Sequence, residues 1–270
     1  MFGYPIAVDG VLSRVLQSGS HGPSLILVHG LSSRADRWRL NIDPLAEAGR
    51  RVFAIDLPGH GFATKGRNFD YSARGFARFL ERFVDQLGEE KVALVGTSFG
   101  ALVVSTFALQ NPARVRALVV AGAIGLLPMG EARRQKTIAW LPDMSREGLR
   151  TRLGLGVVEK SLITDELIEE DFRINNSPGA SEAFAELAHY YATTIDQDAT
   201  CDRLAALNAA FPTMLLWGEH DASVAPSIGV AAHARLPGSR FVTVPDAAHL
   251  PYLEKPALVN RMLAEFLGPV

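Results

Sequence analysis

Cysteine is almost absent from this chain, because Cys201 is the only one in 270 residues. A single cysteine excludes an intrachain disulfide framework and fits a reducing compartment. No Cys/His spacing typical of a metal site accompanies it. We therefore expect no bound metal, and we expect Cys201 to be a small, buried, apolar residue.

Long apolar runs and an excess of one charge are also missing. The stretch 117–127 is among the longest apolar runs, and it falls short of the roughly 18 residues that a membrane-spanning helix needs. The first residues, Met1 to Ile6, lack the basic and then apolar pattern of a secretory signal. With 27 Lys and Arg against 29 Asp and Glu, the formal net charge is −2, so no basic excess attracts nucleic-acid phosphates. We therefore expect a soluble, cytoplasmic protein that acts on a small molecule, with no nucleic-acid or membrane partner; the sequence leaves its oligomeric state open.

The most informative pattern is Gly96-Thr97-Ser98-Phe99-Gly100, which matches G-x-S-x-G and directly follows the apolar run 92–95. In a nucleophile elbow, a serine occupies a strained turn between a strand and a helix, with its hydroxyl exposed. The flanking glycines allow neighbouring backbone to approach closely. We therefore expect Ser98 to be a nucleophile; the alternative is an ordinary serine in a tight turn.

A serine hydroxyl is a weak nucleophile at neutral pH, so it needs a base, which a third group must orient. The elbow has these partners in the chain order serine, acid, histidine, each after a later strand. Asp221 follows one apolar strand-like segment and His249 follows another. We expect Asp221 to orient His249 and His249 to carry the proton, although Glu219 and Asp246 lie close enough in sequence to compete as the acid.

Acyl transfer also needs N–H donors for the oxyanion that forms. One donor is the residue after the nucleophile, here Phe99, and the other lies in a loop after an earlier strand. The loop His29-Gly30-Leu31-Ser32-Ser33 follows a strand-like segment, so we expect the N–H of Leu31 to be the second donor. A plain strand exit is the alternative for this loop. His29 and His60 are expected to shape loops rather than to react.

Short apolar runs alternate with amphipathic segments along most of the chain. Asp9-Gly10 separates two strand-like runs and predicts a β-hairpin. Further strands, buried on both faces as in a parallel sheet, are expected at 25–28, 51–55, 92–95, 117–121, 214–217 and 239–244. Helices are expected at 76–87, 99–110 and 256–267. The pattern predicts an α/β protein with a mostly parallel central sheet flanked by helices.

The alternation stops between Leu127 and Phe211, a gap of about 80 residues that is far longer than an ordinary loop. Charged and apolar residues there alternate at helical spacing in four segments, 131–141, 145–153, 164–172 and 181–194. We therefore expect a helical insertion at 127–210 between two parts of one core, 1–126 and 211–270.

Together these motifs resemble the α/β-hydrolase family. The matching stretches are His29-Gly30, Asp56-Leu57-Pro58-Gly59-His60-Gly61, the G-x-S-x-G motif, Trp217-Gly218-Glu219-His220-Asp221 and His249, in the family's order and over nearly the whole chain. The resemblance implies the α/β-hydrolase fold, a triad of Ser98, Asp221 and His249, no cofactor, and a helical cap over the active site. The related haloalkane dehalogenases and epoxide hydrolases use an aspartate nucleophile, so Ser98 argues against both.

The cap is expected to set substrate preference. The candidate substrate contacts are Gly30, Trp140, Arg173, His189 and Leu250. Arg173 could hold a substrate carboxylate through a bidentate pair, with an ordinary arginine on a helix surface as the alternative.

Residues 171–175 resemble the cap of the meta-cleavage-product hydrolases, which break a carbon–carbon bond in ring-opened aromatic compounds. Those enzymes usually carry Asn in place of Thr97, a Gly-Pro-Gly type of loop in place of Leu31 to Ser33, and Trp in place of Leu250. We therefore expect a serine hydrolase of a small carboxylic ester or lactone. A carbon–carbon bond hydrolase is the first alternative, and a ligand receptor with little turnover is the second.

Overall fold

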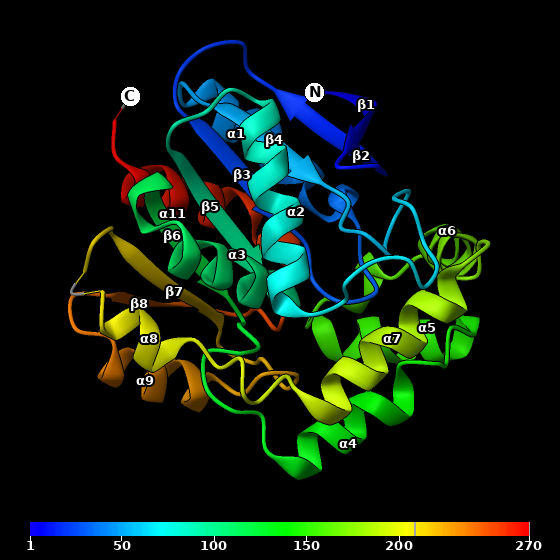
Figure 1. Ribbon diagram of the computed structural model, residues 1–270. Helices are drawn as coiled ribbons and strands as arrows, with labels where there is room; N and C mark the ends of the chain where they lie inside the picture. The colour runs from blue at the N-terminus through cyan, green and yellow to red at the C-terminus, as the bar shows by residue number, and fades with distance from the viewer. Residues whose placement is uncertain (208, 270) are drawn as a thin grey trace.

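The computed structural model describes residues 1–207 and 209–269. Residues 208 and 270, which fall in the expected ranges 127–210 and 211–270, lie outside the described residues. Within the described ranges, one sheet has its strands in the order β1-β2-β4-β3-β5-β6-β7-β8 (Figure 1). The strands are β1 Phe2–Val8, β2 Val11–Ser18, β3 Ser24–Val28, β4 Arg51–Ile55, β5 Val92–Thr97, β6 Val115–Ala121, β7 Thr213–Gly218 and β8 Arg240–Val244.

The sheet is parallel from β4 to β8 and antiparallel at its N-terminal edge, where β1 pairs with β2 and β2 with β4. Asp9 and Gly10 both have positive φ, 49° and 80°, as a two-residue hairpin turn requires. The expected hairpin and the expected mostly parallel sheet are therefore confirmed.

Two apolar layers lie on opposite faces of the sheet. Successive side chains of a strand point to opposite faces, so Leu25 and Leu27 of β3 belong to one core cluster while Ile26 and Val28 belong to the other. All four side chains have no exposed surface. A strand buried on both faces reads as a continuous apolar run, which is why these strands were recognisable in the sequence.

The core helices cover the two faces of the sheet. Helices α2 and α3 pack against one face, and α1 packs with α11 on the other (Figure 1). Ser72 caps α2 by accepting the N–H of Gly75 at 3.1 Å. The core helices are α1 Arg39–Glu47, α2 Ala73–Gln86, α3 Phe99–Gln110, α8 Cys201–Ala205, α9 Pro226–Arg235, α10 Pro251–Glu254 and α11 Pro256–Leu267, and the short 3-10 helices are η1 Ala35–Trp38, η2 Pro112–Arg114 and η3 Lys160–Leu162. In the described part of the chain, no helix has both the length and the apolarity to cross a membrane.

Four further helices form a separate group beside the sheet (Figure 1). They are α4 Glu131–Trp140, α5 Arg146–Gly156, α6 Asp165–Asn175 and α7 Ala180–Thr193. Helix α4 packs against α7, and α5 packs against α6. Helix α8 packs instead against α9 and α3, so it lies with the core helices although its sequence falls in the range 127–210. We refer to α4 to α7 as the cap helices.

Candidate active site

Ser98 lies in a sharp turn between β5 and α3, with φ 52° and ψ −118°. This positive φ is strained for a residue other than glycine. A Cβ on Gly96 would lie 2.3 Å from the carbonyl oxygen of Gly100, and a Cβ on Gly100 would lie 2.3 Å from that of His29. The two flanking glycines are therefore required by the close packing of the turn. The N–H of Ser98 donates to the carbonyl of Ala121 at 2.9 Å, which fixes the turn against β6.

Asp221 and His249 are brought together from the ends of β7 and β8. Nδ1 of His249 donates to Oδ2 of Asp221 at 2.8 Å, and the Asp221 side chain is fully buried. The other carboxylate oxygen, Oδ1, accepts the N–H groups of Ser223 at 2.9 Å and Val224 at 2.8 Å. Since Nδ1 carries the proton, Nε2 of His249 is left as the basic nitrogen.

The alternative acids lie elsewhere. Glu219 and Asp246 are exposed, and the N–H of Asp246 donates to Oε2 of Glu219 at 3.3 Å. His220 is also exposed and lies beside Glu219. Because His249 contacts Asp221, the geometry favours Asp221 over both competitors.

Gly122 is a site residue that sequence reasoning missed. It follows β6 with φ +49°, and a Cβ there would lie 2.9 Å from Nδ1 of His249 and 3.0 Å from Oδ2 of Asp221. A glycine is thus needed where the backbone passes the His249–Asp221 contact. A glycine at a strand end has no chemical signature, so only the fold reveals this role.

The two expected oxyanion donors flank Ser98. Phe99 is the first residue of α3, so its N–H belongs to the group at a helix N-terminus that has no intrahelical partner. Leu31 follows Gly30, where a Cβ would lie 3.0 Å from Cβ of Ser98. The backbone of Gly30 and of Phe99 therefore lies next to the nucleophile, and Leu31 borders the same cavity as Ser98.

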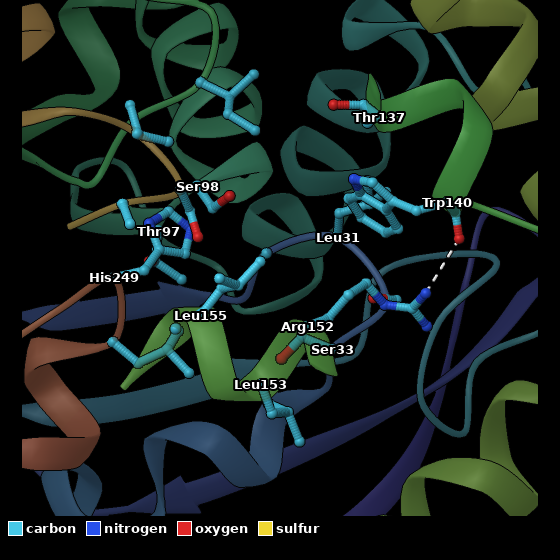
Figure 2. A pocket seen from close by; sticks show the side chains of 18 of the residues that line it. Leu31, Ser33, Thr97, Ser98, Thr137, Trp140, Arg152, Leu153, Leu155 and His249 are labelled. Carbon is cyan, nitrogen blue, oxygen red and sulfur yellow. Dashed lines mark hydrogen bonds between the residues drawn. The ribbon is translucent and has the colours of Figure 1, made fainter. Parts of the chain in front are cut away.

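A cavity of about 200 Å³ lies between the core and the cap helices. Ser98, Thr97 and His249 lie at one side of it, and Trp140 and Arg152 lie at the other, with Leu31 and Leu155 between them (Figure 2). Of the expected substrate contacts, Gly30, Trp140 and Leu250 line this cavity.

Arg173 and His189 do not line the cavity, and the expectation for them is corrected. The Arg173 side chain is 76% exposed and pairs with Glu169 at 2.7 Å on the outside of α6. Helical periodicity explains the placement, because the buried face of α6 contains Ile168, Asp171, Ile174 and Asn175, and position 173 points away from that face. His189 is exposed on α7.

Cationic residues that were not expected line the cavity instead. Arg133 and Lys136 of α4, Arg152 of α5 and Arg37 of η1 all border it. Arg133 and Lys136 are three residues apart on one helix, so they share a face. That spacing was readable in the sequence, but the direction in which the face points was not.

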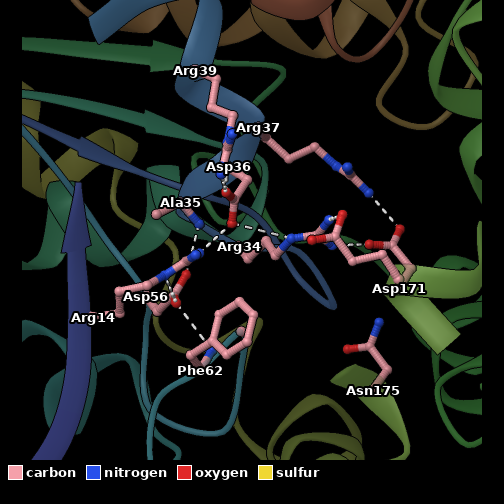
Figure 3. Close-up of polar contacts among 12 residues, drawn as sticks. Arg14, Arg34, Ala35, Asp36, Arg37, Arg39, Asp56, Phe62, Asp171 and Asn175 are labelled. Carbon is pink, nitrogen blue, oxygen red and sulfur yellow. Dashed lines mark hydrogen bonds and ion pairs between the residues drawn. The ribbon is translucent and has the colours of Figure 1, made fainter. Parts of the chain in front are cut away.

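A buried charge cluster joins the core to the cap (Figure 3). Asp171 of α6 pairs with both Arg34 and Arg37, and the three residues are only 2%, 2% and 5% exposed. Arg34 also contacts Asp36, with Nε 3.2 Å from Oδ2. Buried charges are costly unless paired, so this cluster is stable only while the cap lies against η1.

His29 and His60 are fully buried and shape their loops. Nε2 of His29 accepts the N–H of Leu57 at 2.9 Å, and Nδ1 lies 2.8 Å from the carbonyl oxygen of Gly30. Burial lowers the pKa of His29 to about 4 and that of His60 to about 3. Both imidazoles are therefore neutral at pH 7, in agreement with the structural role expected for them.

This chain is similar in sequence to known hydrolases and to an acetyltransferase component. A family model described as the alpha/beta hydrolase fold matches residues 23–256. The dihydrolipoyllysine-residue acetyltransferase component of the acetoin cleaving system of Cupriavidus necator is 29% identical over 97% of this chain and 68% of its own length. The 2-hydroxy-6-oxononadienedioate/2-hydroxy-6-oxononatrienedioate hydrolase of Cupriavidus pinatubonensis is 27% identical over 93% of this chain and 89% of its own.

A solved structure gives a similar result. The meta-cleavage product hydrolase of Pseudomonas fluorescens superposes with a TM-score of 0.85 and 26% identity, covering 97% of this chain and 96% of the other. The likeness therefore extends over the core and the cap helices together.

Proposed function

Because the chain belongs to the alpha/beta hydrolase fold family and is a hydrolase, we propose that Ser98, His249 and Asp221 form its catalytic triad. The observation that carries the proposal is the 2.8 Å contact between His249 and buried Asp221, at a cavity that Ser98 also borders. A nucleophile, a base and an orienting acid are the groups that acyl transfer to serine requires.

The chemistry follows from these positions. Nε2 of His249 takes the proton of Ser98 as Oγ bonds to the substrate carbonyl carbon, and the N–H groups of Leu31 and Phe99 stabilise the oxyanion. Collapse of the tetrahedral intermediate breaks the bond to the leaving group, which takes the proton from His249. Water then bonds to the acyl carbon as His249 takes its proton, the acyl–Oγ bond breaks as His249 returns that proton to Ser98, and the carboxylic acid leaves.

We propose a small carboxylic ester or lactone as the substrate. A cavity of about 200 Å³ whose wall includes leucine side chains between its two ends favours a compact substrate with an apolar middle. Thr97 and Leu250 at the cavity, in place of the asparagine and tryptophan usual in meta-cleavage-product hydrolases, also favour this assignment.

Carbon–carbon bond hydrolysis is the second candidate. It is favoured by the relatives, because the curated hydrolase at 27% identity and the solved structure at 26% both carry names of this type of enzyme. Both candidate reactions would use the same triad and the same cavity, so the substrate alone distinguishes them.

The test is a substrate panel measured with the wild type and with Ser98→Ala. The panel contains p-nitrophenyl esters of increasing chain length, small lactones and a 2-hydroxy-6-oxo-dienoate. We expect kcat for esters to fall by several orders of magnitude in a folded Ser98→Ala protein. Near-wild-type turnover by that variant would reject the triad, and a kcat/KM for the dienoate far above that for every ester would select the second candidate.

A further inference from the structure

The cavity wall opposite Ser98 has an excess of positive charge. In the part of the chain that the structure describes, four cationic side chains line the cavity, Arg37, Arg133, Lys136 and Arg152, against one carboxylate, Asp171. Asp171 is already engaged by Arg34 and Arg37. The remaining three cations, all on the cap helices α4 and α5, form no ion pair with any described residue. We call Arg133, Lys136 and Arg152 the cap cations.

Arg152 is held rigidly without a counter-ion. Its Nη1 donates to the carbonyl oxygens of Trp140 at 3.0 Å and Asp143 at 2.5 Å, and its Nη2 lies 3.3 Å from the sulfur of Met144. The guanidinium lies 4.9 Å from the centre of the Trp140 ring. These contacts fix its position (Figure 2) and are all to neutral groups, while Asp143 and Asp171 act on the guanidinium only from beyond ion-pair distance.

Arg133 is placed in a similar way. Its Nη2 donates to the carbonyl oxygen of Ser223 at 2.6 Å, which is again a neutral partner. Burial lowers the pKa of both Arg133 and Arg152, because taking a guanidinium out of water disfavours its charged form. Lys136 is exposed at the same cavity and adds a flexible charge to it.

Arg133 and Arg152 are partly desolvated, and no described carboxylate lies within ion-pair distance of either, so a bound anion would offset part of the cost of their burial. Their placement also has a geometric consequence. Arg152 lies across the cavity from Ser98, and Leu31 and Leu155 lie between them (Figure 2). A ligand that reached both ends would carry its reactive carbonyl at one end, an apolar spacer in the middle and a negative charge at the other.

We propose that the cap cations form a subsite for a carboxylate on the substrate, remote from the bond that is broken. This inference rests on the proposed function and adds the substrate class, an acyl group with a free carboxylate at its far end. A charged hydrogen bond made by both the ground state and the transition state acts as uniform binding, so its effect falls on KM rather than on kcat.

The test compares two matched ester pairs in which a terminal carboxylate replaces a methyl group. The pairs are the p-nitrophenyl half-esters of adipate and suberate, and p-nitrophenyl hexanoate and octanoate. In the wild type we expect kcat/KM to be about tenfold to a hundredfold higher for at least one half-ester than for its neutral partner, the effect of a charge-assisted hydrogen bond. The preference should shrink as ionic strength rises.

Three variants locate the effect. Arg152→Gln and the double variant Arg133→Gln/Lys136→Gln should each lose most of the preference, with kcat/KM falling much further for the half-ester, mainly through a higher KM, than for the neutral ester. Arg173→Gln is the matched control, because it removes an arginine that is paired with Glu169 outside the cavity, and it should keep the preference. Arg152 also holds the turn between α4 and α5 through its contacts with Trp140 and Asp143. The double variant leaves those contacts intact, so it tests the subsite independently of that turn.

The outcomes separate the two proposals. If no ester is turned over, or Ser98→Ala is as active as the wild type, the proposed function fails. If neutral esters are turned over by Ser98 but no half-ester is preferred, the carboxylate subsite is rejected while the function stands. A preference that survives in both cap-cation variants would also reject the subsite.

Discussion

Ser98 has a backbone conformation that costs energy, and its surroundings must offset that cost. The contact of its N–H with Ala121 at 2.9 Å and the tight approach of Gly96 and Gly100 hold the residue in place. The sequence predicted this turn because a glycine-flanked serine after an apolar run is a rare combination. It predicted Asp221 and His249 from their chain order, their positions after strand-like segments and the family resemblance. Gly122 and the cap cations needed the fold, since their roles depend on the residues that lie opposite them.

The orienting role of Asp221 gives a direct prediction. Asp221→Asn should lower kcat by about three to four orders of magnitude, because an amide can hold His249 in the wrong tautomer. Asp246→Asn is the control, since Asp246 is exposed and its φ of 51° is one that asparagine also adopts. We expect the control to change kcat by less than about twofold. Steady-state kinetics on one ester measure kcat for both variants. Equal losses of kcat in the two variants would contradict the orienting role of Asp221.

Helix α6 shows why the cap was predicted as a group of helices but not in its orientation. Charged and apolar residues at helical spacing indicated α4 to α7 to within a few residues. The same pattern left open which face of each helix meets the core, and of the two alternatives for Arg173, a cavity contact or an ordinary arginine on a helix surface, the 76% exposure of its side chain supports the second. The residue that reaches the core is Asp171, two positions earlier, because it lies on the buried face of α6.

The contact of α6 with η1 predicts a large stability effect. Asp171→Ala leaves Arg34 and Arg37 buried without their shared carboxylate, and should lower the free energy of unfolding by about 3 to 5 kcal/mol. Glu170→Ala is the matched control on the same helix, because Glu170 also pairs with Arg34 but its side chain is 52% exposed. Its loss should cost about 0 to 1 kcal/mol. Urea denaturation measures both, and similar losses would mean that the buried cluster does not stabilise the cap.

The whole molecule combines a sheet covered on both faces with a cap that closes one end of it. The fold class followed from the sequence, because strands buried on both faces read as apolar runs and the long interruption indicated an insertion. Helices α1 and α9 were not predicted, and α1 contains Pro44, which a sequence pattern treats as a break. Of the cavity-lining residues, the sequence predicted mainly those near Ser98. The cationic residues of the cap side were not predicted, because the cavity forms where segments distant in sequence meet.

Two buried histidines predict how the stability of the whole protein depends on pH. Because the folded-state pKa values of His29 and His60, about 4 and about 3, lie below that of a free histidine, the unfolded chain binds more protons below about pH 6.5. Their stabilising effect is therefore complete above that pH and is lost as the pH falls toward about 4 for His29 and about 3 for His60. The loss is up to about 1.4 kcal/mol per pH unit for each histidine.

Urea denaturation between pH 7 and pH 4 checks this prediction. His60→Leu should flatten the pH dependence of the free energy of unfolding relative to the wild type, because it removes one of the two groups. His233→Leu is the control, since His233 is only partly buried. Identical slopes for the wild type and His60→Leu would contradict the account.

Active-site titration with a p-nitrophenyl alkylphosphonate tests the central claim, the nucleophilic role of Ser98, most directly. Oγ of an activated serine bonds to the phosphorus of this reagent and displaces p-nitrophenol, which leaves a phosphonylated serine. We predict one equivalent of p-nitrophenol per chain, loss of esterase activity in parallel, and a single adduct on the peptide that contains Ser98. His249→Ala should react far more slowly, because the serine then has no base. An adduct on another residue, or full activity after one equivalent has reacted, would contradict the proposed triad.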